Sequence, residues 1–172
     1  MYQRILVATD GSALSKKAVK HAIALAASTG AALVALKIVP RYPMSFFEGS
    51  ATVSIDTIKA AESKWADEAG VQLEGIVAEA AAAGVKAKAT VVKSDLIAES
   101  IISAAKKHKA DIVVMASHGR KGLKRILLGS EALAVLTHSE VPVLILRESG
   151  QGGGAWIVAC RPHVGCFTPH TP

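Results

Sequence analysis

The sequence predicts an α/β protein with an open, five-stranded parallel sheet and helices on both faces. Short apolar runs rich in β-branched residues alternate with longer segments whose apolar residues recur at helical spacing. The 172 residues are enough for one domain with a full core. Since 51% of the residues are apolar but only 4% are aromatic, the core must consist mainly of Ala, Val, Ile and Leu. These features favour helices packed closely on a sheet and joined to it by right-handed crossovers.

The first strand is predicted at Arg4–Thr9, an apolar run that is followed directly by Asp10. Both faces of this run are apolar, which is typical of a central strand in a parallel sheet. A helix is predicted over Ser12–Thr29, where apolar residues repeat at helical spacing until Gly30 ends it. The second strand is predicted at Ala31–Val39, which completes the first strand–helix–strand unit.

The middle of the chain contains a variable segment, a long helix and a third strand. Residues 41–54 have no clear period, so they form a lid, a partner contact or, as we favour, a surface loop whose two phenylalanines enter the core. Residues 55–83 are rich in Ala and Glu and predict a helix, interrupted near Gly70 or Gly75. Val85–Lys93 alternates polar and apolar residues, which indicates a strand with one wet face near the edge of the sheet.

Two more helices flank a fourth strand. Ser94 and Asp95 can cap the helix that follows the third strand. Asp111–Ala116 is a short β-branched run, which predicts a strand buried on both faces. The last helix is predicted over about Glu131–His138, with Ser130 as its N-cap.

The final strand is predicted at Val141–Arg147 and, because it arrives last, is expected at an edge of the sheet. An exposed apolar edge would associate with another chain, so we expect a homodimer through this strand. Residues 1–148 form the predicted domain, and residues 149–172 predict a glycine-rich flexible linker and a disordered extension. The extension contains Cys160, His163, Cys166 and His170. Their spacing is tight and no metal-binding fold surrounds them, so zinc binding is not favoured.

Composition and charge exclude several classes of protein. The formal net charge of +6 allows anionic ligands, but nucleic acid is not favoured because no aromatic and basic strip accompanies it. The N-terminus begins with the first strand and lacks the apolar segment of a signal peptide. No apolar run approaches the roughly 20 residues of a membrane-spanning helix. We therefore expect a soluble cytoplasmic protein with no membrane partner.

Residues 113–130 predict the site around which the chain is organised: a buried strand, a basic loop and the start of a helix. The loop brings together backbone N–H groups and hydroxyls of Ser117, Gly119, Gly129 and Ser130. A helix N-terminus with no bulky side chain in front of it attracts anions. Positive charge is added nearby by Arg120, Lys121, Lys124 and Arg125. We interpret this stretch as a phosphate site.

The predicted strand order places a second segment beside this loop. Neither the P-loop motif nor the dinucleotide-binding fingerprint occurs in the chain. In a sheet of order 3-2-1-4-5, the carboxyl ends of the first and fourth strands flank the switch point, where ligands bind. Asp10 and Gly119 then lie on opposite sides of one crevice. Asp10 can accept a hydrogen bond from a ribose hydroxyl or an adenine amino group, or Asp10 or Ser12 can simply cap the next helix.

The chain resembles the nucleotide-binding universal stress proteins over residues 1 to about 148. The resemblance rests on Ile5–Ser12, on Ala110–Gly119, and on Gly129 and Ser130 before the last helix. The family's ATP-binding signature is G-x2-G-x9-G-[ST]. Ala116 stands at its first glycine, while Gly119, Gly129 and Ser130 match the other positions. The resemblance implies a Rossmann-like fold of the adenine nucleotide alpha hydrolase-like type.

The resemblance further implies a dimeric regulatory module that binds ATP in a stress response. It places the adenine and ribose against Ala8, Thr9, Asp10 and Ile38, with Met115 and Ala116 beneath the ribose. It places the phosphates against Ser117, His118, Gly119, Gly129 and Ser130. The methyl group of Ala116 either narrows the floor of the site or requires a backbone shift. The alternative is therefore a nucleotide-independent interaction protein with an unidentified protein partner.

The sequence contains no nucleophile–base pair that points to catalysis, so no catalytic residue is assigned. His118, the only histidine in the predicted site, is interpreted as a phosphate-binding group. Asp10, with phosphate oxygens and waters, can hold one Mg²⁺. ATP hydrolysis is expected to be slow, which leaves a slow ATPase as a further alternative to a non-enzymatic sensor.

Overall fold

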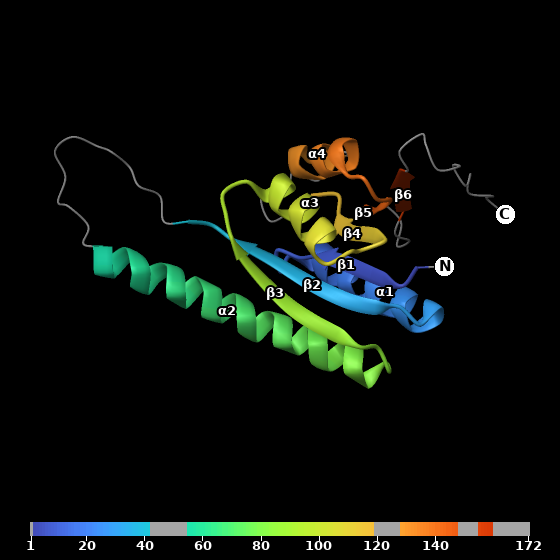
Figure 1. Ribbon diagram of the computed structural model, residues 1–172, viewed down its shortest axis with the longest axis horizontal. Helices are drawn as coiled ribbons and strands as arrows, with labels where there is room; N and C mark the ends of the chain where they lie inside the picture. The colour runs from blue at the N-terminus through green and yellow to red at the C-terminus, as the bar shows by residue number, and fades with distance from the viewer. Residues whose placement is uncertain (1, 42–54, 119–127, 148–154, 160–172) are drawn as a thin grey trace.

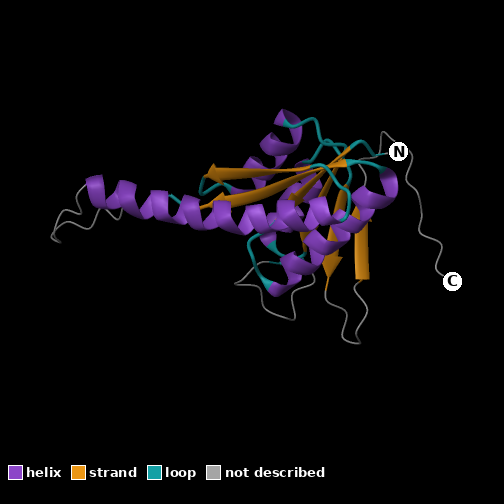
Figure 2. Ribbon diagram, turned by 90° about the horizontal axis from the view of Figure 1, so that it is seen from below, coloured by secondary structure: helices purple, strands orange, loops and turns teal. Residues whose placement is uncertain are grey.

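The computed structural model describes residues 2–41, 55–118, 128–147 and 155–159. They form a sheet that lies between two helical layers (Figures 1 and 2). The strands are β1 Arg4–Ala8, β2 Ala32–Val39, β3 Ala87–Lys93, β4 Ile112–Ala116, β5 Val143–Arg147 and β6 Ala155–Ala159. The helices are α1 Ala13–Thr29, α2 Ile55–Ala82, α3 Ile97–Lys107 and α4 Ser130–His138.

The sheet has the strand order β3-β2-β1-β4-β5-β6. Its first five strands are parallel, which confirms the predicted parallel sheet of order 3-2-1-4-5. In β1, Ala8 pairs with Leu36 of β2, and Val7 pairs with Val114 of β4. The carboxyl ends of β1 and β4 therefore lie side by side, as the predicted switch point requires.

The far edge of the sheet differs from the prediction. The sequence predicts the edge strand within Val141–Arg147, but β6 runs antiparallel along β5 and takes that place. The pairs run from Val143↔Ala159 to Arg147↔Ala155. A strand therefore lies within the segment 149–172, for which the composition predicts no regular structure. The cysteines and histidines of that segment lie outside the described residues.

Local sequence signals explain the ends of α1 but not the length of α2. Ser12 Oγ accepts the N–H of Ser15 at 3.2 Å and caps α1, and Gly30 ends the helix with a φ of 71°. α2 continues unbroken through Gly70 and Gly75, so the predicted interruption is wrong. A helical glycine costs only about 1 kcal/mol relative to alanine, and burial of one face of a long helix offsets that cost.

The start of α3 does not follow the local capping prediction. The helix begins after Leu96, and neither Ser94 nor Asp95 caps it. Instead, the N–H of Ala98 donates to Oε2 of Glu131, in the first turn of α4, at 3.0 Å. A carboxylate from a neighbouring helix thus satisfies a backbone donor that the adjacent sequence leaves free.

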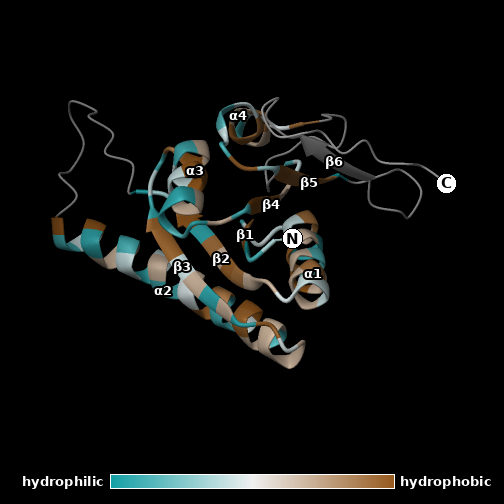
Figure 3. Cartoon of the chain, turned by 45° about the vertical axis from the view of Figure 1, so that its right-hand side comes forward, coloured by the Kyte–Doolittle hydropathy of each residue, from teal (hydrophilic) through white to brown (hydrophobic). Residues whose placement is uncertain are grey.

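Two apolar clusters form the core, one on each face of the sheet. The first lies under α1 and α2, and the second lies under α3 and α4. Successive residues of β1 alternate between them: Ile5 and Val7 belong to the first cluster and Leu6 to the second. The apolar character of β4 and β5 stands out in Figure 3. Within the described ranges, no helix is both long and apolar enough to cross a membrane.

Candidate functional site

The turn after β1 is braced by its own side chains. The N–H of Thr9 donates to the carbonyl of Leu36 at 3.0 Å, which extends the pairing of β1 with β2. Asp10 Oδ1 accepts the N–H of Ser12 at 3.0 Å. Gly11 has a φ of 82°, a left-handed conformation that favours glycine. The capping interpretation is therefore correct for Ser12, while one oxygen of Asp10 stabilises the turn at the switch point.

The residues after β4 are tied both to the sheet and to the start of α4. The N–H of Ser117, which is fully buried, donates to the carbonyl of Leu146 at 2.8 Å. The carbonyl of Ser117 accepts the N–H of Gly129 at 2.8 Å. Its hydroxyl lies 3.1 Å from Nδ1 of the half-buried His118. The chain therefore leaves β4 and enters α4 at one point, although Ser117 and Gly129 are well separated in the sequence.

Gly129 is the N-cap of α4, so the prediction that Ser130 caps this helix is wrong. The carbonyl of Gly129 accepts the N–H of Leu133 at 2.9 Å, which makes Ser130 the first helical residue. A Cβ on Gly129 would lie 3.1 Å from the carbonyl oxygen of Ser117 and 3.6 Å from Cα of His118. Glycine is favoured here because the backbones approach closely, so that a Cβ would force the neighbouring chain to shift slightly. The φ of −74° is open to any residue.

The first turn of α4 offers donors to an anion. The N–H groups of Ser130, Glu131 and Ala132 have no hydrogen-bond acceptor within the described part of the chain. Such groups at the positive end of a helix dipole favour negative charge. The carboxylate of Glu131 would repel an anion, but it is directed to the N–H of Ala98 at the start of α3. The start of α4 can therefore bind phosphate oxygens.

The structure brings the predicted site residues to one end of the sheet but divides them between its two faces. Ala8, Ile38 and Met115 pack with the cluster under α3 and α4. Ala116 belongs to the cluster under α1, and the hydroxyl of Thr9 lies 3.0 Å from Ser15 Oγ of α1. Five further residues of the predicted loop lie outside the described residues: Gly119, Arg120, Lys121, Lys124 and Arg125.

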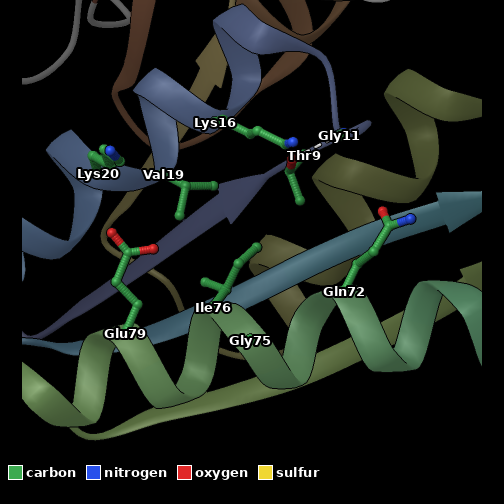
Figure 4. A pocket seen from close by; sticks show the side chains of 9 residues that line it. All are labelled: Thr9, Gly11, Lys16, Val19, Lys20, Gln72, Gly75, Ile76 and Glu79. Carbon is green, nitrogen blue, oxygen red and sulfur yellow. Dashed lines mark hydrogen bonds between the residues drawn. The ribbon is translucent and has the colours of Figure 1, made fainter.

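A cavity of about 340 Å³ opens between α1 and α2, on the side of the β1 turn that faces α1 (Figure 4). It is lined by Thr9, Gly11, Lys16, Val19, Lys20, Gln72, Gly75, Ile76 and Glu79. Thr9 is the one predicted site residue among them. The available sequence signals were the lysines at helical spacing on α1 and Gly75, whose missing side chain leaves open space. The cavity therefore adjoins the switch point from the opposite face of the sheet.

A second cavity, of about 230 Å³, lies between β3 and α3, and no predicted site residue lines it. Within it, Oγ1 of Thr90 lies 3.4 Å from Nε2 of His108. Burial, and then the charges of Lys88, Lys107 and Arg4, lower the pKa of His108 below its ordinary value of 6.5. The described residues contain no group of three or more His, Cys, Asp or Glu side chains that could hold a metal ion.

Comparisons with known proteins agree on one family. Residues 1–147 match the model of the universal stress protein family. Universal stress protein MJ0531 of Methanocaldococcus jannaschii is 33% identical over 150 residues, which cover 86% of this chain and 84% of the relative. Both the family model and this relative account for most of the chain.

Solved structures agree with the same assignment. The structure of protein MJ0577 from the same organism matches with a TM-score of 0.75 and 29% identity, over 88% of this chain and 99% of that one. A universal stress protein solved in complex with cAMP matches with a TM-score of 0.62 and 30% identity, over 86% of this chain and 99% of that one. These proteins share the fold over nearly their whole length.

Proposed function

This chain belongs to the universal stress protein family, and we propose that it acts as an ATP-binding regulatory module in a stress response. The observation that carries the proposal is the start of α4, where three N–H groups have no acceptor among the described residues. The relative in complex with cAMP adds support, because cAMP shares adenine, ribose and phosphate with ATP.

In this proposal, the phosphates of ATP lie against the start of α4. Ser130 donates through its N–H and its hydroxyl, and Gly129 lets the end of β4, with His118, lie close to the start of the helix. His118 donates from the end of β4, and Gly119 completes the contacts. Ser117 acts indirectly, because it is buried and holds both His118 and Gly129.

The adenosine lies across the carboxyl ends of β1, β2 and β4. Ala8, Ile38 and Met115 give the base an apolar surface on the side of α3 and α4. Asp10 accepts a hydrogen bond from a ribose hydroxyl, and Thr9 supports the turn from the side of α1. Ala116 packs in the cluster under α1, so its methyl group points away from that apolar surface.

Mg²⁺ accompanies the ATP and neutralises phosphate charge. Asp10 is the carboxylate of the proposed set, and phosphate oxygens and water supply the remaining ligands, as Mg²⁺ prefers.

The proposed homodimer can form only when the outer edge of β5 is not paired with another strand of the same chain. The interface expected at Val141–Arg147 would use that edge, and β6 pairs with it in this structure. The binding of ATP to one chain does not depend on this interface.

The direct test is to denature freshly purified protein and identify the released nucleotide by mass spectrometry, followed by calorimetric titration with ATP and cAMP. We expect bound or titratable ATP, with affinity that increases when Mg²⁺ is present. Absence of both would favour the nucleotide-independent interaction protein. Steady-state phosphate release from the wild type and from His118→Ala separates the sensor from the slow ATPase: fast release that the substitution abolishes would identify an enzyme.

A further inference from the structure

The outer edge of β5 is the feature of the fold that the sequence predicts least well. β5 is Val-Leu-Ile-Leu-Arg, and three of its five residues are buried. Its inner edge pairs with β4, from Val113↔Val143 to Ala116↔Leu146. Its outer edge pairs with β6 through all five residues. Both edges of this strand are therefore engaged within a single chain.

The strand β6 is an addition to the family fold. The family model ends at residue 147, before β6 begins. Without residues after 147, the outer backbone N–H and C=O groups of β5 would have no strand beside them. An apolar edge of this kind pairs readily with another strand.

A second copy of β5 has the same chemistry as β6. The strand β6, Ala-Trp-Ile-Val-Ala, is uncharged, five residues long and antiparallel to β5. When two copies are related by a two-fold axis across this edge, their β5 strands also run antiparallel, and four of the five residues of each are apolar. The edge can therefore accept either occupant, but not both together.

We propose that β6 is an intramolecular competitor of dimerisation: it occupies the edge of β5 that a second copy of this chain would otherwise use. The full chain is then a monomer at this edge, and displacement of β6 converts it to a dimer with a continuous sheet. This inference concerns the homodimer of the proposed function and is independent of nucleotide binding.

The tether gives β6 a large advantage over a second copy. Residues 148–154 connect the two strands, so β6 is presented to β5 at a millimolar effective concentration. A second chain at micromolar concentration is then disfavoured by about a thousandfold for equal intrinsic pairing. Because both chains must release β6 before their β5 strands can pair, this disadvantage applies twice, and removing β6 should lower the apparent dissociation constant of the dimer by at least that factor.

The first experiment keeps the full chain and places proline at two neighbouring positions of β6. Ile157 and Val158 pair with Ile145 and Leu144. Successive N–H groups of a strand point to opposite sides, so only one of the two faces β5, and the other faces away from the sheet. In sedimentation velocity at micromolar concentration, we expect a monomeric wild type. We expect one of Ile157→Pro and Val158→Pro to dimerise, while the other serves as its matched control.

A second experiment shortens the chain in two ways. A chain of residues 1–147 lacks β6 and should dimerise, whereas a chain of residues 1–159 keeps β6 and should remain monomeric. Both lack Cys160 and Cys166, so disulfide exchange does not distinguish them. In the shorter chain, hydrogen exchange of the β5 amides should slow as protein concentration rises, which locates the interface at this edge.

A dimeric wild type whose β5 amides gain protection as protein concentration rises would show that β6 does not exclude a second copy from this edge, and it would overturn the competition. So would a shortened chain and two proline variants that all remain monomeric. Calorimetry with ATP on the same samples keeps the two proposals distinguishable, because nucleotide affinity should be the same in all of them.

Discussion

The two ends of the sheet use their polar groups in opposite ways. At the amino end of β1 and β4, Asp111 Oδ2 accepts the backbone N–H groups of Gln3 and Arg4, the latter at 2.8 Å. The guanidinium of Arg4 donates to the carbonyl of His108 at 2.6 Å. At the carboxyl end of the same strands, the first turn of α4 has N–H groups with no acceptor in the described ranges.

This difference separates stability from ligand binding within one fold. The amino end joins β1, β4 and the end of α3 through hydrogen bonds that the chain completes itself. The carboxyl end holds its backbone through Asp10 and Ser117 but keeps donors available to an external group. In an open α/β sheet, ligands bind outside the carboxyl ends of the strands, so substitutions at the two ends should differ in kind.

The largest effect is expected from Asp111→Ala. Hydrogen bonds to a charged acceptor contribute about 1.5–3 kcal/mol each, and this change removes two of them. We expect the free energy of unfolding in urea to fall by about 3 kcal/mol, while ATP affinity under folding conditions stays unchanged. A parallel loss of ATP affinity in fully folded protein would contradict the division between the ends.

Gly129→Val lies at the carboxyl end of the sheet and should lower ATP affinity rather than stability. A side chain here begins 3.1 Å from the carbonyl oxygen of Ser117 and 3.6 Å from Cα of His118, so a bulky one pushes the end of β4, with His118, away from the start of α4. We expect ATP affinity in calorimetry to fall by about 100-fold, or about 2.7 kcal/mol, with the fold retained.

The matched control is Gly75→Ala, since nothing lies within 4 Å of a Cβ at Gly75. This helical change should stabilise the protein by about 0.5–1 kcal/mol and leave ATP affinity unaltered. Equal losses of ATP affinity in both glycine variants would show that Gly129 has no special place in the site.

Asp10→Asn should give a smaller change at the carboxyl end. Asparagine retains an oxygen that accepts the N–H of Ser12, so the turn should persist, but the negative charge is lost. We expect ATP affinity to fall by about tenfold, or about 1.4 kcal/mol, and its enhancement by Mg²⁺ to shrink. An undiminished effect of Mg²⁺ would remove Asp10 from the proposed metal ligands.

The smallest effect is a pH dependence near the amino end. Burial, followed by the charges of Lys88, Lys107 and Arg4, lowers the pKa of His108 below 6.5 in the folded protein. The unfolded chain therefore binds the proton more readily than the folded protein. The contribution of neutral His108 to the free energy of unfolding is thus present above the unfolded pKa and is lost as pH falls through the folded pKa. We expect the free energy of unfolding in urea to decline less between about pH 7.5 and about pH 5.5 for His108→Gln than for the wild type. An equal decline in the two proteins would exclude His108 as the source of this pH dependence.

The sequence predicts the parallel sheet and its order because periodicity and β-branching repeat in every unit. The features that it does not predict depend on contacts between residues that lie in different helices or strands. The donor of α3 is satisfied by Glu131, whereas capping rules consider only neighbours such as Ser94 and Asp95. β6 is a short apolar run after a glycine-rich stretch, and it becomes a strand only because β5 has an edge to pair with.

For the candidate site, the sequence predicts which segments meet, but it does not predict where each side chain of those segments lies. It predicts that the ends of β1 and β4 meet, and the structure confirms this. The division of Ala8 and Thr9 between opposite faces follows from strand alternation, whose outcome changes with a one-residue shift in register. The spacing of the signature identifies a glycine at position 129, but it does not predict that the backbone there lies against Ser117, because the two residues are distant in the sequence.

The hydrogen bond that joins Ser117 to Gly129 has an evolutionary consequence. Because the strand and the helix meet at one anchor, an insertion or replacement in the intervening span begins and ends at a fixed position. Descendant genes can therefore change the length of this span while they inherit the same junction between β4 and α4.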